Sequence, residues 1–114
     1  MTDHQFSAIF NAALNSDDRA AFISDWVISS IWGDPEGVSI PDARLDELGA
    51  LWDAAHLTIR DIRARTGLTQ AAFAERFLIP KRSVENWEGG QRECPAYLRL
   101  MLAQLAGAYS RSRS

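Results

Sequence analysis

Apolar residues recur at three- and four-residue intervals along most of this chain, the spacing that buries one side of an α-helix. In residues 1–57 this pattern forms stripes that are separated by Asn15-Ser16 and by the turn-rich stretch 33–39. The stripes are Phe6, Ile9, Phe10, Ala13 and Leu14; Phe22, Ile23, Trp26, Val27, Ile31 and Trp32; and Leu45, Leu48, Leu51, Trp52 and Ala55. We expect a helix for each, the second running up to Gly33 and the third opening at Pro41.

Start signals continue the helical pattern through the second half of the chain. Thr58 and Asp61 form a capping pair at the start of one helix. Thr69 can cap the next, in which Phe73 and Phe77 lie four apart on the buried side. A last helix is expected from Pro95 to about Tyr109, and the whole pattern predicts an all-α fold.

The segment between Pro80 and Gly89-Gly90 is the most informative part of this half. Pro80 stops the preceding helix and opens a new one over residues 80–88, which the glycine pair ends. Val84 and Trp87 face inward. The outward residues carry forked or charged tips that match base edges and phosphates in a major groove: Lys81, Arg82, Glu85 and Asn86.

From Leu57 to about Gly107 the chain resembles the helix-turn-helix family of lambda-type repressors and Cro, also called the Xre family. The residues that carry the resemblance are Gln70, Ala74, Ser83 with Val84, Glu88, Gly90 and Pro95. Two positions depart from the pattern: Trp87 replaces an aliphatic residue, and Pro80 opens the recognition helix. The resemblance implies a lambda repressor-like helix-turn-helix bundle, here with an N-terminal helical extension.

The resemblance also implies roles for individual residues. The expected base-reading residues are Lys81, Arg82, Glu85 and Asn86; the expected phosphate contacts are Gln70, Ser83, Gln91 and Arg92. Arg63 and Glu88 fall on positions that form an ion pair in this family. Glu85 has two interpretations, an acceptor for a cytosine or a surface partner of Arg82 or Lys81.

Charge divides the chain into two halves of opposite sign. Residues 58–114 hold ten Lys and Arg against five acids, and residues 1–57 hold two against ten. The basic half suits phosphate neutralisation, and the acidic carboxylates of the other half are expected to form a solvated face.

The predicted organisation has four parts. Residues 1–40 form an acidic helical region, 41–57 a connecting helix, 58–109 the DNA-binding domain and 110–114 a flexible tail. Part of the apolar surface exceeds the needs of one small core, at Trp26, Trp32, Trp52, Met101 and Leu105. These residues form either a dimer or partner interface, or the contact between the two halves of a monomer.

Other classes of function lack their signatures. The sequence has no Gly-rich phosphate loop, no metal-ligand spacing and no nucleophile beside a base, so we expect neither an enzyme nor a cofactor. His4 and His56 are far apart, and Cys94 is the single cysteine. No segment is apolar enough for a membrane span and the N-terminus does not resemble a secretion signal, so a cytoplasmic protein without membrane contact is expected.

Two functions remain open. The first is a sequence-specific double-stranded DNA-binding transcriptional regulator, a repressor acting as a homodimer on an inverted repeat. The second is an antitoxin or adaptor, whose N-terminal helices bind a toxin or other protein while the helix-turn-helix binds its own promoter. Only the second predicts tight co-purification with a small basic partner.

Overall fold

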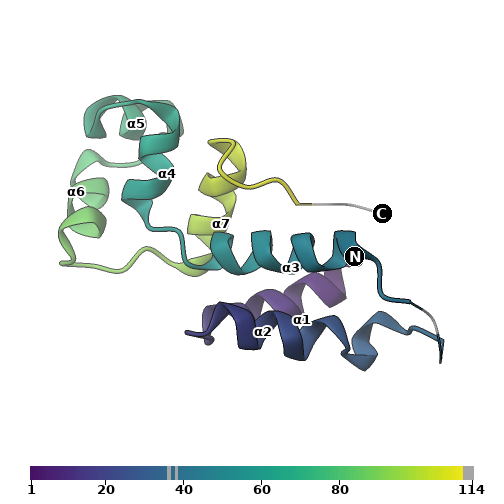
Figure 1. The fold of residues 1–114 in the computed structure, drawn as a ribbon. Helices are drawn as coiled ribbons and strands as arrows, with labels where there is room; N and C mark the ends of the chain where they lie inside the picture. The colour runs from purple at the N-terminus through teal and green to yellow at the C-terminus, as the bar shows by residue number, and fades with distance from the viewer. Residues whose placement is uncertain (36, 38, 112–114) are drawn as a thin grey trace. The chain divides into compact units, whose positions relative to one another are not determined.

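The computed structural model describes residues 1–35, 37 and 39–111, and in these residues all regular structure is helical, which confirms the expected all-α class (Figure 1). The elements in chain order are α1 (Asp3–Leu14), α2 (Arg19–Val27), the 3₁₀ turn η1 (Ser30–Trp32), α3 (Asp42–Ala55), α4 (Ile59–Thr66), α5 (Gln70–Phe77), α6 (Lys81–Gly89) and α7 (Ala96–Leu105). None of the described helices has the length and apolar character needed to cross a bilayer.

The chain divides into two compact units. Unit 1 comprises residues 1–56 with 111–114, of which 112–114 lie outside the described residues, and unit 2 comprises residues 57–110. α3, expected as a connecting helix, packs on both α1 and α2 within unit 1. The buried side chains of this unit follow the expected stripes and include Phe6, Ile9, Phe10, Ala13, Phe22, Leu48, Leu51, Ala54 and Ala55.

α2 is shorter than the apolar stripe predicts. It ends at Val27, and Ile31 and Trp32 lie in η1 instead. The Ser29 hydroxyl accepts a hydrogen bond from the backbone N–H of Ile31 at 3.2 Å, so this serine caps a new turn rather than continuing the helix. Ile28 and Leu45 are exposed, although Leu45 belongs to the expected stripe.

Unit 2 encloses a separate core made by α4, α5, α6 and α7. Its fully buried side chains include Ile62, Phe73 and Val84, and Trp87 packs against them. Thr58 and Asp61 form the expected capping box, and the Thr69 hydroxyl accepts from the N–H of Ala72 at 3.1 Å. α6 begins at Lys81, one residue after the expected start, with Pro80 at its N-cap.

A short turn joins α5 to α6 and contains an unusual residue. Leu78 takes a left-handed conformation, with φ 55°, and its side chain is 92% exposed. A left-handed backbone disfavours any residue with a Cβ, so this leucine is strained and gains little from packing. The turn nevertheless closes, because the N–H of Ile79 donates to the carbonyl of Ala74 at 2.9 Å.

The C-terminal region differs from the expectation in two places. α7 ends at Leu105, short of Tyr109, because Gly107 takes φ 76° and lets the N–H of Ala108 donate back to the carbonyl of Ala103. The expected tail begins at residue 110, yet Arg111 is bound within unit 1. It donates to Asp3 at 2.7 Å and lies over the ring of Phe6. The rest of the expected tail, 112–114, lies outside the described residues.

Candidate functional site

The outer face of α6 presents the side chains expected to read bases. Lys81, Arg82 and Glu85 are exposed and Asn86 is partly exposed, while Val84 on the opposite side is fully buried. Within the described part of the chain, no hydrogen bond or ion pair engages the side chains of Lys81, Arg82 or Glu85. The surface pairing considered for Glu85 is therefore not formed, and these charged tips are available to a ligand.

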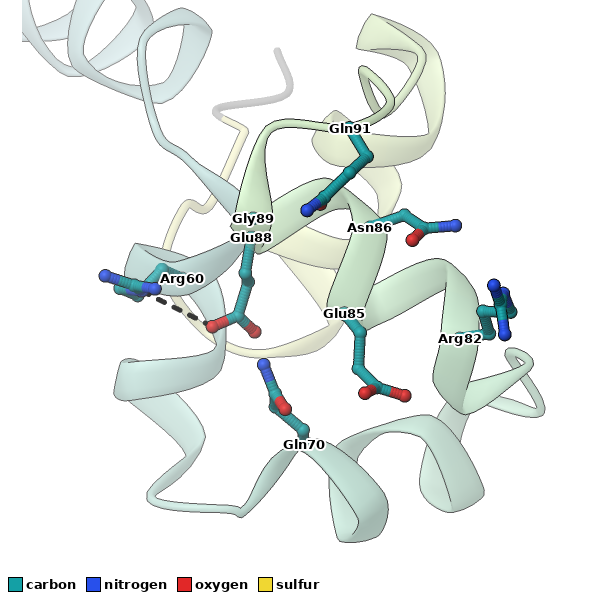
Figure 2. A pocket seen from close by; sticks show the side chains of 8 residues that line it. All are labelled: Arg60, Gln70, Arg82, Glu85, Asn86, Glu88, Gly89 and Gln91. Atoms are coloured by element: carbon teal, nitrogen blue, oxygen red, sulfur yellow. Dashed lines mark hydrogen bonds and ion pairs between the residues drawn. The ribbon is translucent and has the colours of Figure 1, made fainter.

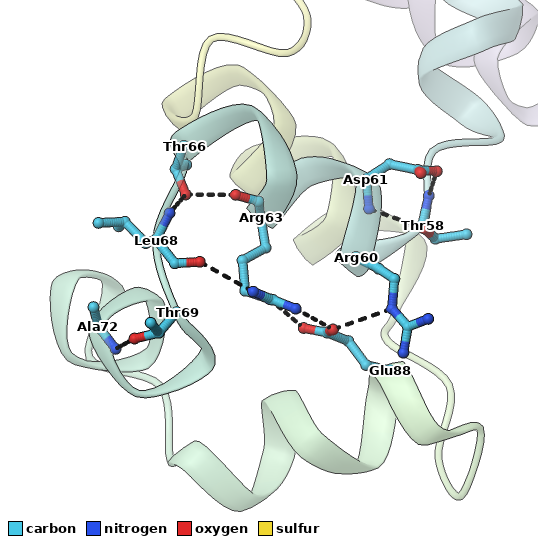
Figure 3. A network of polar contacts seen from close by, with 9 residues as sticks. All are labelled: Thr58, Arg60, Asp61, Arg63, Thr66, Leu68, Thr69, Ala72 and Glu88. Atoms are coloured by element: carbon cyan, nitrogen blue, oxygen red, sulfur yellow. Dashed lines mark hydrogen bonds and ion pairs between the residues drawn. The ribbon is translucent and has the colours of Figure 1, made fainter.

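An ion pair fixes the far end of α6 to α4 (Figure 3). Arg63 donates from Nε to Oε2 of Glu88 at 2.7 Å and from Nη2 to Oε1 at 2.8 Å, a bidentate arrangement. Its Nη1 also donates to the carbonyl of Leu68 at 3.0 Å, in the segment that leads into α5. One guanidinium therefore joins α4, the start of α5 and α6, which holds the outer face of α6 at a fixed angle.

The carboxylate of Glu88 is removed from solvent, its side chain being 1% exposed. The hydrogen bonds from Arg63 lower the pKa of Glu88 below its ordinary value; burial opposes this effect, and Arg60 and Gln70 add smaller lowering contributions. Glu88 is thus held ionised inside the unit by its cationic neighbours.

The residues expected to contact phosphate lie in different surroundings. Gln70 is the first residue of α5 and its amide points toward Glu88 (Figure 2). Ser83 is half-buried on α6, whereas Gln91 and Arg92 are exposed in the following loop. The backbone N–H groups of Gln91 and Arg92 both donate to the carbonyl of Asn86, which fixes this loop to the end of α6.

A polar hollow of about 500 Å³ brings several of these residues together (Figure 2). It is lined by Arg60, Gln70, Arg82, Glu85, Asn86, Glu88, Gly89 and Gln91. Of these, Arg60 was not assigned a role from the sequence. The spacing of Arg60 and Arg63, three residues apart on one helix, places both on one face and was the available signal.

The tryptophans expected at an interface are engaged inside unit 1. Trp32 donates from Nε1 to the carbonyl of Trp26 at 2.6 Å, and Arg44 lies over its ring. Trp52 donates to Ser16 Oγ at 3.3 Å and stacks on His56. The ring of Trp26 packs against Phe22, and all three indoles stay partly exposed, so these contacts account for part of each surface.

Met101 and Leu105, the other expected interface residues, are exposed on α7 and share one face with Tyr97. The exposed fractions of Tyr97, Met101 and Leu105 are 69%, 53% and 68%. Their spacing of four residues aligns them into an uncharged stripe along the helix.

Comparison with protein-family models, with curated proteins and with solved structures finds no match to this chain. The assignment of function therefore depends on the geometry described above.

Proposed function

We propose that this protein is a sequence-specific double-stranded DNA-binding transcriptional regulator of the lambda repressor-like helix-turn-helix type, with α5 and α6 as the two helices of the motif. The observation that carries the proposal is the outer face of α6. It offers two cations, a carboxylate and an amide whose side chains have no hydrogen-bond or ion-pair partner among the described residues, on a helix whose inner face packs into a core. Such side chains can read base edges only if the helix that bears them is rigid.

Charge supports the same assignment. Residues 57–110 contain eight Lys and Arg and five Asp and Glu, a net charge of +3. Arg63 and Glu88 neutralise each other in the interior, so the surface cations of α6 and its neighbours are left for phosphates. We assign Arg82 to a guanine, because two N–H groups of its planar guanidinium can donate to the O6 and N7 acceptors of that base.

Selection of bound duplexes from random DNA at stated salt tests the function. Wild type should enrich one motif, and a double variant Lys81→Ala, Arg82→Ala should enrich none. Arg82→Ala alone should lose about 1 to 3 kcal/mol on the selected site and less on random duplex. An equal loss on both would reassign Arg82 to a phosphate, and no enrichment by wild type would remove the proposal.

A second candidate function is an antitoxin or adaptor whose unit 1 binds a basic protein. It is favoured by the exposed aliphatic residues Ile28, Ile40 and Leu45 in a unit rich in acids. In unit 1 the described arginines are already paired, Arg19 with Asp53, Arg44 with Asp34 and Arg111 with Asp3, which leaves further carboxylates unneutralised. Co-purification of a small basic protein with the native chain would support this function, and its loss in an Ile28→Ser, Leu45→Ser variant would place the contact.

A further inference from the structure

We infer that the hollow beside α6 binds one phosphate of the DNA backbone, with Arg60 as its cation and the side chains of Gln70 and Gln91 as additional donors. The inference depends on the proposed function and assigns a new contact within it. Arg60 is the residue whose role the sequence pattern did not supply.

The side chain of Arg60 is bound to Glu88 through one nitrogen, and most of it remains accessible to a ligand. Its Nε donates to Oε1 of Glu88 at 3.4 Å, a long bond, while the side chain remains 70% exposed (Figure 2). Among the described residues neither terminal nitrogen of Arg60 has a hydrogen-bond partner. The charge of Glu88 is already matched by the bidentate Arg63. Arg60 is therefore an additional cation, held by its stem with its donors toward solvent.

The charges around the hollow favour an anion. Glu85 and Glu88 contribute two negative charges; Arg60, Arg82 and the Arg63 behind Glu88 contribute three positive ones. A phosphodiester carries one negative charge, so it would bring this cluster to balance. The lining also provides the side-chain amides of Gln70 and Gln91, whose N–H groups can donate to a phosphate oxygen as readily as to a water.

The side chain of Gln91 lines the hollow where the backbone beneath it has no Cβ. It lies directly over Gly89, and a Cβ at that position would collide with its amide oxygen. Glycine at position 89 therefore makes room for the amide at the edge of the hollow. The amide of Gln70 reaches the hollow from α5, so donors from α4, α5 and the loop after α6 line it (Figure 2).

Position along α6 identifies the ligand as backbone rather than base. Arg60 contacts Glu88, which follows Lys81 by seven residues on α6. At a rise of 1.5 Å per residue, Lys81 and Glu88 lie roughly 10 Å apart along the helix axis. The major groove is only about 12 Å wide. When the first turn of α6 contacts bases in the middle of the groove, a helix axis that crosses the groove carries the end near Glu88 toward the groove edge, where the phosphates are.

Salt dependence of DNA binding tests the contact. We compare wild type, Arg60→Gln and a matched control, Arg65→Gln, which removes an exposed arginine from the same helix, outside the hollow. Arg60→Gln should lower the slope of log K against log salt by about 0.9 and weaken binding about tenfold at 0.1 M salt. The loss should be equal on the selected site and on random duplex, because a phosphate carries no sequence.

Arg65→Gln should leave the slope unchanged, and thermal unfolding should show that both variants stay folded. An unchanged slope for Arg60→Gln, or an equal fall for Arg65→Gln, would overturn the assignment of Arg60 while leaving the proposed function intact. If wild type bound no duplex at any salt, the proposed function would fail and this contact with it.

Discussion

At the scale of single residues, Glu88 is placed where a carboxylate is intrinsically unfavourable. It lies in the last turn of α6, where the carbonyl ends of the helix carry partial negative charge, and its side chain is 1% exposed. Arg63 compensates both effects by a bidentate bond, and together the two residues connect α4 to α6. The pairing of Arg63 with Glu88 could be predicted from the resemblance. For Arg60 the spacing places its side chain on the same face of α4 as Arg63, but only the structure shows that it reaches Glu88.

Glu88→Gln should destabilise the protein by about 2 kcal/mol, because the charge of Arg63 loses its partner in a partly buried site. The effect should depend on pH. The pKa of Glu88 is lowered on folding, mainly by Arg63, so its stabilising contribution is complete above the ordinary value of 4.5 and is lost as pH falls below it through the folded pKa. Denaturant unfolding at pH 7 and at successively lower pH values should show the wild type approaching Glu88→Gln.

Glu75→Gln is the control for this measurement. It removes an exposed carboxylate from α5 that has no hydrogen bond or ion pair within the described residues. It should leave stability at pH 7 almost unchanged. A gap between wild type and Glu88→Gln that stays constant down to acid pH would show that the ion pair contributes little.

At the scale of elements, the helix starts were more predictable than the helix ends. Thr58 with Asp61, and Thr69, cap helices where expected, because a capping side chain acts on neighbours within one turn. For α2 and α7 the apolar stripes predict later ends than the structure shows, since the stripes continue past Ser29 and Gly107, where the backbone leaves the helix. Periodicity identifies which face is apolar, but it does not reveal where the backbone leaves the helix.

The turn between α5 and α6 yields a prediction at this scale. Leu78→Gly should stabilise the protein by about 0.5 to 1 kcal/mol, because relief of a left-handed conformation worth roughly 1 to 2 kcal/mol exceeds the entropy cost of a glycine. Little packing is lost, since the leucine side chain is 92% exposed. Thermal or denaturant unfolding measures the change.

Leu78→Ala separates the backbone effect from the removal of an exposed apolar group. Alanine keeps the Cβ that causes the strain, so this variant should stay within about 0.5 kcal/mol of wild type. If alanine stabilised as much as glycine, the strain at φ 55° would not be the cause.

At the scale of the whole molecule, the separation of acidic and basic residues into two halves could be predicted from the sequence. Which residues or partner cover the apolar surface could not. The count of acids and bases needs no coordinates, and the basic half coincides closely with unit 2. The tryptophans, expected either at a dimer or partner interface or between the two halves of a monomer, make contacts within unit 1, where Trp32 bonds to the carbonyl of Trp26 and Trp52 to Ser16. Composition reports how much apolar surface a chain carries, not which partner covers it.

The stripe of Tyr97, Met101 and Leu105 on α7 is exposed, and under the proposed function we predict that it forms the two-fold contact between copies of this chain. It is uncharged, so it can face itself across a symmetry axis without repulsion. The double variant Met101→Lys, Leu105→Lys places like charges on both sides of that axis. Sedimentation should then show a monomer for the variant, whereas we expect wild type to sediment as a dimer.

The same variant provides a test on DNA. A dimer reads two half-sites whose centres lie about 34 Å apart, so wild type should lose the selected site when about five base pairs are inserted between them. The double-lysine variant should bind the native and the lengthened sites equally, and weakly. Ala64→Lys, on the exposed side of α4, controls for added charge and should remain a dimer that discriminates the two sites. If the double variant kept both the dimer mass and the dependence on spacing, the contact would have to lie elsewhere on the molecule.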